Sequence, residues 1–246
     1  RRRRQAYMMA TRAVLLLGIT ATAAMSLAPV SDSALPLSNK RILLPMSRTE
    51  AGQLAGQLVL AGARPLWCPA VRWKPMADLE ALDDALMRIT EFDVLVLLGP
   101  NAIDTVAERW LALADGSVDM VQAMLEASKI EIGVVGTDAQ RFRARLGASV
   151  SVAPIEPSAR ALAVTLCDLG HVRPGTKVLV TAGRVEGAAL EDLPRDVESV
   201  LEQLTRDGAS VERVDTHLIT LSPAAEMQAE LGVLAGGHVD VICAGS

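Results

Sequence analysis

Aromatic residues are scarce in this chain of 246 residues, since Phe, Trp and Tyr together make up 2% of it. Single-stranded nucleic acids bind proteins largely by stacking bases on aromatic rings, so this scarcity argues against a nucleic-acid partner. The formal net charge of −5 likewise argues against a general binder of polyanions. Hydrophobic residues nevertheless account for 50% of the chain, so its core must consist of aliphatic side chains.

Cysteine and histidine are also rare, with three of each. Cys68, Cys167 and Cys243 are widely spaced, form no CxxC pair and do not cluster with the histidines. An odd number of dispersed cysteines indicates neither a disulfide framework nor a zinc site. We therefore expect three small buried thiols in a reducing compartment, and no bound metal.

The N-terminal segment 1–40 is poor in acidic residues and opens with four arginines. An apolar stretch from Ala13 to about Ala28 follows, and then a tract rich in Ser and Ala. This order resembles a cleaved targeting segment of the plastid transit-peptide kind, with a mitochondrial signal as the alternative. The apolar stretch is shorter than the roughly 20 residues that span a bilayer, so we expect no stable anchor in the mature protein, with a retained anchor as the alternative.

From Arg41 onward, short aliphatic runs alternate with amphipathic segments. Strands are expected at "RILLP", "RPLWCPAVRW", "DVLVLL", "IEIGVVG", "VSVAP", "TKVLVTAG", "SVERVDTHLIT" and "VDVICAGS", with helices between them. Such alternation is typical of an α/β fold with parallel sheets. Because the sequence stops on a strand with no helix to cover it, we expect a chain truncated at its C-terminus.

Four of these strands run into turns that contain glycine: "LLGPNA", "VVGTDA", "TAGRVEG" and "CAGS". Ligands of parallel sheets bind beyond the carboxyl ends of the strands, where helix N-termini favour anions. None of the turns is a GxGxxG or P-loop motif, so nucleotide cofactors are not expected. The alternative is that these glycines only permit unusual backbone angles. The candidate substrate-binding residues are Gly99, Pro100, Asn101, Ala102, Gly136, Thr137, Gly183, Arg184 and Ser246.

Few charged or titratable side chains form recognisable catalytic patterns. Arg141 and Arg145 share one helical face, which is typical of a solvated surface, whereas Arg184 directly follows a strand end. The carboxylates of "LEALDDAL" are expected to face solvent. His217 has the side chain that titrates near neutral pH, so it is a candidate proton donor, and a structural role is its alternative.

The order of longer segments adds a further indication. "RILLPMSRTEAGQLAGQLVLAGARPLWCPAV" places a helix ending in Gly between two strands, and "FDVLVLLGPNAIDTV" runs from an aromatic-Asp pair through a strand to Asn-Ala. "IGVVGTDAQRFRARLGASV", "GTKVLVTAGRVEG" with its following helix and strand, and "HVDVICAGS" come next. In this order and spacing, residues 41–246 resemble the uroporphyrinogen-III synthase family.

The resemblance implies two parallel-sheet lobes, Rossmann-like or flavodoxin-like, joined by a two-strand hinge. Residues 41–72 and 218–246 would form an incomplete first lobe, and residues 73–217 the second. The implied substrate is hydroxymethylbilane, a linear tetrapyrrole that the family dehydrates and cyclises with inversion of ring D. The resemblance implies a monomeric enzyme of heme or chlorophyll biosynthesis that needs no metal or organic cofactor.

The chain departs from the family pattern at several motif positions. Leu98 and Gly99 stand where the family has Thr-Ser, and Ala139 stands at a Thr position. His217 aligns with the Tyr proposed in the family as the proton donor. The leading hypothesis is a synthase in which His217 donates the proton. One alternative is a catalytically silent relative that binds a linear tetrapyrrole or another polycarboxylate, and another is an unrelated sensor similar to periplasmic binding proteins.

Overall fold

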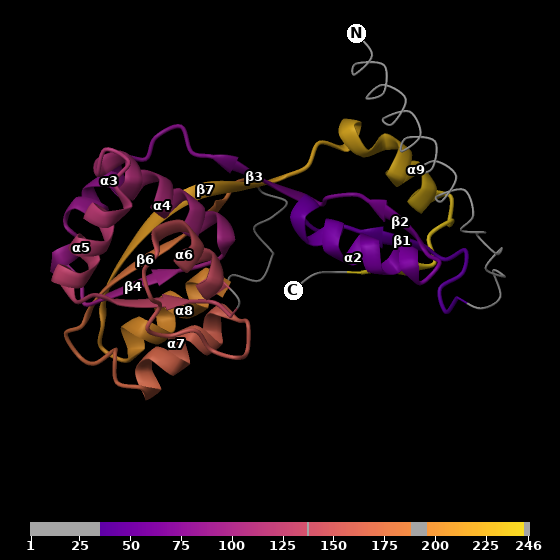
Figure 1. Cartoon of the computed structure of the whole chain (residues 1–246). Helices are drawn as coiled ribbons and strands as arrows, with labels where there is room; N and C mark the ends of the chain where they lie inside the picture. Colours follow the sequence, from indigo (N-terminus) through magenta and orange to yellow (C-terminus); the bar gives the residue numbers. More distant parts are fainter. Residues whose placement is uncertain (1–34, 137, 188–195, 244–246) are drawn as a thin grey trace, which may run out of the picture. The chain divides into compact units, whose positions relative to one another are not determined.

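The computed structural model describes residues 35–136, 138–187 and 196–243. Their contacts divide the chain into two compact units (Figure 1). Unit 1 falls within Arg1–Cys68 and Ala229–Ser246, and unit 2 comprises Pro69–Gln228. The leader predicted at 1–40 lies almost wholly outside the described residues, which begin at Leu35.

Unit 1 contains a small parallel sheet in the order β2-β1-β8. Its central strand is buried from Ile42 to Leu44, because it has a neighbour on each side and packs against helix α2. The edge strand β8 is exposed at both of its residues, and helix α9 has no buried residue. The elements are β1 (Arg41–Leu44), α2 (Arg48–Leu60), β2 (Arg64–Trp67), α9 (Gln228–Ala235) and β8 (Val241–Ile242).

Unit 2 is built on a five-stranded sheet in the order β3-β7-β6-β4-β5. Four of its strands are parallel, and β3 runs antiparallel to β7 at one edge. The aliphatic runs thus predict the α/β class correctly, and the antiparallel edge makes the second sheet mixed. The strands are β3 (Val71–Pro75), β4 (Val94–Leu97), β5 (Glu131–Val134), β6 (Lys177–Val185) and β7 (Ser210–Leu221).

Helices cover both faces of this sheet (Figure 1). One apolar cluster joins the sheet to α3, α4, α5 and α6, and the other joins it to α7 and α8. Strand β4 lies between the clusters and is completely buried, which is why its sequence is an unbroken aliphatic run. The helices are α3 (Glu80–Met87), α4 (Pro100–Leu113), α5 (Val118–Ser128), α6 (Asp138–Leu146), α7 (Ala159–Asp168) and α8 (Asp196–Arg206), with 3-10 turns at Ile89–Glu91 and Ala224–Met227.

Two strand predictions are wrong in detail. The segment "RPLWCPAVRW" forms two strands in different sheets, because β2 ends at Trp67 and Pro69, which has no N–H to donate, precedes β3. The segment "VSVAP" makes only an isolated bridge between Val152 and Gly133. The predicted strand-helix alternation is otherwise the one observed.

Cys68, Cys167 and Cys243 form no disulfide bond. Cys68 is buried, and Cys167 and Cys243 are half-buried. Burial raises the pKa of the Cys167 thiol to about 12, and a hydrogen bond with Asp207 adds to the shift. Such a thiol is almost entirely protonated at neutral pH and is therefore unreactive.

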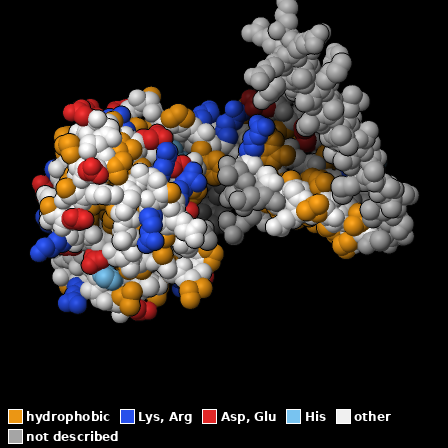
Figure 2. Space-filling view, viewed as in Figure 1, with side chains coloured by type: hydrophobic (Ala, Val, Ile, Leu, Met, Phe, Trp, Pro, Cys, Tyr) orange, Lys and Arg blue, Asp and Glu red, His pale blue; other side chains and the backbone are white. Residues whose placement is uncertain are grey.

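The described residues offer neither a metal site nor a membrane span. Within these ranges, no three His, Cys, Asp or Glu side chains come close enough to hold a metal ion, and no helix is long and apolar enough to cross a bilayer. Acidic, basic and hydrophobic side chains are interspersed on the face of unit 2 in view (Figure 2). That face therefore carries no broad field of one sign.

Candidate functional site

The strand register aligns three of the candidate glycines across the sheet in unit 2. Leu97 of β4 pairs with Val134 of β5 and with Thr181 of β6. Gly99, Gly136 and Gly183 each lie two residues beyond one of these three matched positions. Because neighbouring strands are about 4.8 Å apart, the three glycines form one row across the sheet. Gly99 and Gly136 lie beyond the carboxyl ends of β4 and β5, whereas Gly183 lies within β6, which continues to Val185.

The first turn of this row starts helix α4. Gly99 has a φ of 92°, a conformation in which a side chain would be strained, and Pro100 occupies the first turn of the helix. Ala102 is fully buried and Asn101 is half-buried. The turn thus combines a left-handed backbone with the unpaired N–H groups of a helix start, as an anion site requires.

The second turn already has its own carboxylate. Gly136 has a φ of 50°, and a Cβ there would lie 2.9 Å from Pro157 Cβ. Thr137, the next candidate, lies outside the described residues. Asp138 begins α6, and burial raises the pKa of its carboxyl group. A carboxylate at a helix start competes with any bound anion, so this turn is a weaker anion site than the first.

Arg141 and Arg145 lie on an exposed helical face, as predicted, and form ion pairs there. Both guanidinium groups bind Asp104 of α4, and Arg145 also contacts Glu108 at 3.1 Å. Burial raises the pKa of Asp104, but the hydrogen bonds from the two arginines outweigh it and hold that pKa below its usual value. In "LEALDDAL", Glu80 and Asp84 are exposed as predicted, whereas Asp83 is half-buried and binds Arg109. These ion pairs join α4, the helix that begins at the first turn, to α6 and to α3.

The Asp104→Ala variant is expected to lower the free energy of unfolding by about 1 kcal/mol, because it leaves two arginines without their shared partner. The estimate is small because exposed ion pairs contribute little. Urea denaturation measures the change. Glu108→Ala is the matched control, because Glu108 is 67% exposed and its one ion pair within the described ranges is with Arg145. Equal losses in the two variants would contradict a special role for Asp104.

The turn predicted directly after "TKVLVTAG" is wrong, because Gly183 and Arg184 pair with β7 as part of strand β6. Gly183 instead contacts His217 directly. Gly183 pairs with His217 across a bulge in the β6–β7 ladder, and a Cβ on Gly183 would lie 2.5 Å from His217 Nε2. His217 itself is only 6% exposed. Gly183, unlike Gly99 and Gly136, does not have a positive φ. It is therefore required for the close approach of the imidazole and not for an unusual backbone angle.

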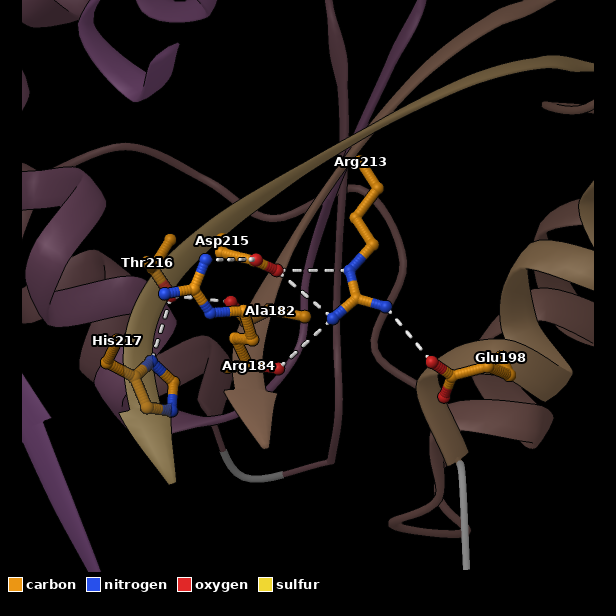
Figure 3. A network of polar contacts seen from close by, with 8 residues as sticks. Ala182, Arg184, Glu198, Arg213, Asp215, Thr216 and His217 are labelled. Atoms are coloured by element: carbon orange, nitrogen blue, oxygen red, sulfur yellow. Dashed lines mark hydrogen bonds and ion pairs between the residues drawn. The ribbon is translucent and has the colours of Figure 1, made fainter. Parts of the chain in front are cut away.

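Thr216 fixes the orientation of this imidazole (Figure 3). The Thr216 hydroxyl lies 3.0 Å from the Ala182 carbonyl oxygen and 2.9 Å from His217 Nδ1. The hydroxyl has one proton, which it donates to the carbonyl, and it can then accept a hydrogen bond from Nδ1–H. This arrangement satisfies all three groups with a neutral imidazole whose Nε2 has no proton.

Burial lowers the pKa of His217 to about 4, against a weaker opposing effect of Asp215. A buried histidine with this pKa is charged in roughly one molecule in a thousand at pH 7. A neutral imidazole is a poor acid at that pH. The hypothesis that His217 donates a proton stays a prediction, and its burial against Gly183 favours the structural alternative.

The low pKa of His217 gives a dependence of stability on pH. The pKa is lower in the folded chain than the ordinary 6.5, so the unfolded chain binds more protons between pH 6.5 and pH 4. The stabilisation is complete above pH 6.5 and decreases as the pH falls through this window. We expect about 2 kcal/mol of unfolding free energy to be lost from pH 7 to pH 5.

Denaturation of the wild type and of His217→Gln at both pH values measures this loss. The variant cannot titrate at this position, so its stability should fall by less. Parallel losses in the two proteins would show that other groups cause the acid sensitivity.

Arg184 belongs to a polar network that the sequence did not predict (Figure 3). Asp215 contacts Arg184 at 3.9 Å and Arg213 at 3.1 Å, and Arg213 also contacts Glu198 of α8 at 3.1 Å. The alternating charges of "ERVDTH" were the only indication of this network in the sequence. Ser246, the remaining candidate, lies outside the described residues.

Comparison with known proteins identifies the family. The model of the family described as "Uroporphyrinogen-III synthase HemD" matches residues 52–246. The chain belongs to the uroporphyrinogen-III synthase family. This membership excludes the alternative of an unrelated sensor.

An individual member of the uroporphyrinogen-III synthase family matches a shorter part of the chain than the family model does. The chain is 30% identical over 127 residues to a uroporphyrinogen-III synthase of Synechococcus elongatus, a match that covers 52% of this chain and 45% of that relative. It thus matches less than half of that relative's length.

A crystal structure of a mutant uroporphyrinogen III synthase from the thermophilic bacterium Thermus thermophilus has a similar fold, with a TM-score of 0.52 and 15% identity over 82% of this chain and 71% of that one. At this identity the likeness supports the α/β architecture of the family and no more.

Proposed function

We propose that this protein is a uroporphyrinogen-III synthase, which dehydrates and cyclises hydroxymethylbilane to uroporphyrinogen III with inversion of ring D. The observation that carries the proposal is the family match over residues 52–246, which includes the whole row of Gly99, Gly136 and Gly183. The protein would then act in tetrapyrrole biosynthesis, in the branch that leads to heme and chlorophyll.

The chemistry of the row suits such a substrate. Hydroxymethylbilane has eight carboxylates, and helix starts such as that of α4 offer backbone N–H groups to anions. Loss of its hydroxyl group needs a proton donor and a shape that directs the rearranging attack. Shape and backbone groups can supply much of this without a metal or an organic cofactor.

The second candidate function is a silent relative that binds a linear tetrapyrrole or another polycarboxylate without turnover. Leu98 and Gly99 provide no hydroxyl group at the first turn, and Ala139 provides none at the start of α6. The buried, neutral imidazole of His217 is a poor replacement for an acidic tyrosine. These four residues are specific reasons to test turnover separately from binding.

The test gives the full-length protein hydroxymethylbilane and separates the type III from the type I isomer of the product by chromatography. Hydroxymethylbilane closes spontaneously to the type I isomer, so a reaction without protein is the control. A predominance of type III supports the synthase. A product that is only type I, from a protein that still binds the tetrapyrrole, supports the silent relative.

His217→Phe tests the proton donor in the same assay. A variant that keeps the full rate removes His217 as the acid, and a folded variant that loses the rate supports the prediction.

The proposal extends to localisation and assembly. We propose import into plastids directed by segment 1–40, with mitochondria as the alternative, and a mature protein that is a monomer without a membrane anchor. Residues 1–40 fused to a fluorescent protein test the destination, and light scattering of the purified protein tests the monomer.

A further inference from the structure

A leucine of strand β7 lies between a basic residue of β3 on one side and a basic residue of β6 on the other. The register pairs Lys74 of β3 with Leu218 of β7, and Leu218 with Arg184 of β6. Residues that pair across neighbouring strands point to the same face of a sheet. Lys74 and Arg184 therefore share a face, with their Cα atoms about 10 Å apart, or two strand spacings.

Lys74 and Arg184 form fewer close ion pairs than Arg72 and Arg213 of the same three strands. Arg213 contacts both Asp215 and Glu198 at 3.1 Å, and Arg72 contacts Glu226 at 2.9 Å. Lys74 forms no ion pair with any side chain in the part of the chain that the structure describes, and the contact of Arg184 with Asp215 is long, at 3.9 Å. Lys74 and Arg184 are both exposed, so a ligand can reach them without breaking a close ion pair.

The position of this pair relates it to the candidate site. Arg184 directly follows Gly183, the third member of the row of glycines, and Lys74 lies one residue from Pro75, which pairs with His217. Long side chains can extend their charged ends over an apolar neighbour while their stems pack against it. The ammonium and guanidinium groups can therefore both approach a group that lies above the half-buried Leu218.

We propose that Lys74 and Arg184 bind a carboxylate of the tetrapyrrole substrate, while Leu218 contacts the apolar atoms next to that carboxylate. A guanidinium group and an ammonium group can each donate to one carboxylate oxygen, and charge-assisted hydrogen bonds of this kind are stronger than neutral ones. This inference rests on the proposed function and adds two specificity-determining residues to it.

The first test measures binding of uroporphyrin I, an octacarboxylate, by titration calorimetry. Lys74→Met and Arg184→Gln each remove one charge and keep much of the stem, and each is expected to weaken binding about fivefold, as is usual for exposed ion pairs. The double variant should weaken it by about 20-fold and reduce its dependence on salt. Arg143→Gln is the matched control, because it removes one exposed charge from α6, and it should change binding less than about twofold.

The second test measures steady-state turnover of hydroxymethylbilane. The Lys74 and Arg184 variants should raise KM about fivefold with kcat nearly unchanged, because the carboxylate contact is made equally in the ground state and the transition state. The inference is wrong if the wild type does not bind uroporphyrin I, if the double variant binds it as tightly as the wild type, or if Arg143→Gln weakens it equally.

The two tests distinguish this inference from the proposed function. A wild-type protein that forms no type III isomer, but binds uroporphyrin I through Lys74 and Arg184, would contradict the synthase and support the carboxylate site. A synthase whose uroporphyrin I affinity and KM are both insensitive to the two substitutions would contradict only the carboxylate site.

Discussion

The Trp110→Ala variant is expected to lose about 3–5 kcal/mol of unfolding free energy, the usual cost of removing a large aromatic side chain from a core. Trp110 is 2% exposed and is among the largest fully buried side chains of the chain. It packs from α4 into the cluster that joins the sheet to α3, α5 and α6. Since α4 begins at the first glycine turn, loss of this packing should also reduce activity at high temperature. Denaturation in urea measures the change.

Trp110→Phe is the matched control for this prediction. The indole Nε1 is buried and has no hydrogen-bond partner among the described residues, so its removal relieves an unsatisfied donor. The smaller ring leaves a cavity that offsets part of this gain. The Phe variant should therefore lose less than about 1.5 kcal/mol. Similar losses in Trp110→Phe and Trp110→Ala would mean that the indole N–H is satisfied in solution.

The Gly183→Val variant is expected to lose about 3 kcal/mol, at the upper end of the range for overpacking. A Cβ at position 183 would lie 2.5 Å from His217 Nε2 and 2.9 Å from Ile219 Cδ1. The imidazole cannot move away easily, because it is buried and bound to Thr216. Gly183→Ala should cost less than Gly183→Val.

A double-mutant cycle with His217→Ala tests the cause of this loss. Removing the imidazole takes away the nearest atom, so Gly183→Val should cost at least about 1 kcal/mol less in the His217→Ala background, a coupling typical of residues in contact. The contact with Ile219 remains and explains any residual cost. Additive effects of the two substitutions would contradict the close approach of His217 to Gly183.

The sequence predicts the features that depend on local patterns. The aliphatic run "DVLVLL" predicts β4 because a strand covered on both faces has no polar side, and Gly99 followed by Pro100 predicts where α4 begins. The alignment of the turns at Gly99 and Gly136 is also predictable, because parallel strands place their carboxyl ends at one edge.

Other features depend on contacts between distant parts of the chain. The ion pair of Arg141 with Asp104 joins residues 37 positions apart, and no local pattern in the sequences of α4 and α6 indicates this pairing. The packing of His217 against Gly183 likewise joins two strands and depends on their register. Hydrophobic periodicity contains no information on such register, so the sequence left a proton donor and a structural residue as alternatives for His217 and could not show that it is buried against Gly183.

The bulge between β6 and β7 has a consequence for the electrostatics of His217. Ala182 pairs with Asp215 and Gly183 with His217, so Thr216 is an extra residue in β7. In a regular strand, residues 215 and 217 would be neighbours on one face, and the carboxylate would stabilise an imidazolium ion. The extra residue instead turns the two side chains to opposite sides of the ribbon. A one-residue insertion thus separates a potential acid-base dyad. The Asp215 carboxylate is left to pair with Arg184 and Arg213. For the pKa of His217, the lowering by burial then outweighs the raising by the charge of Asp215.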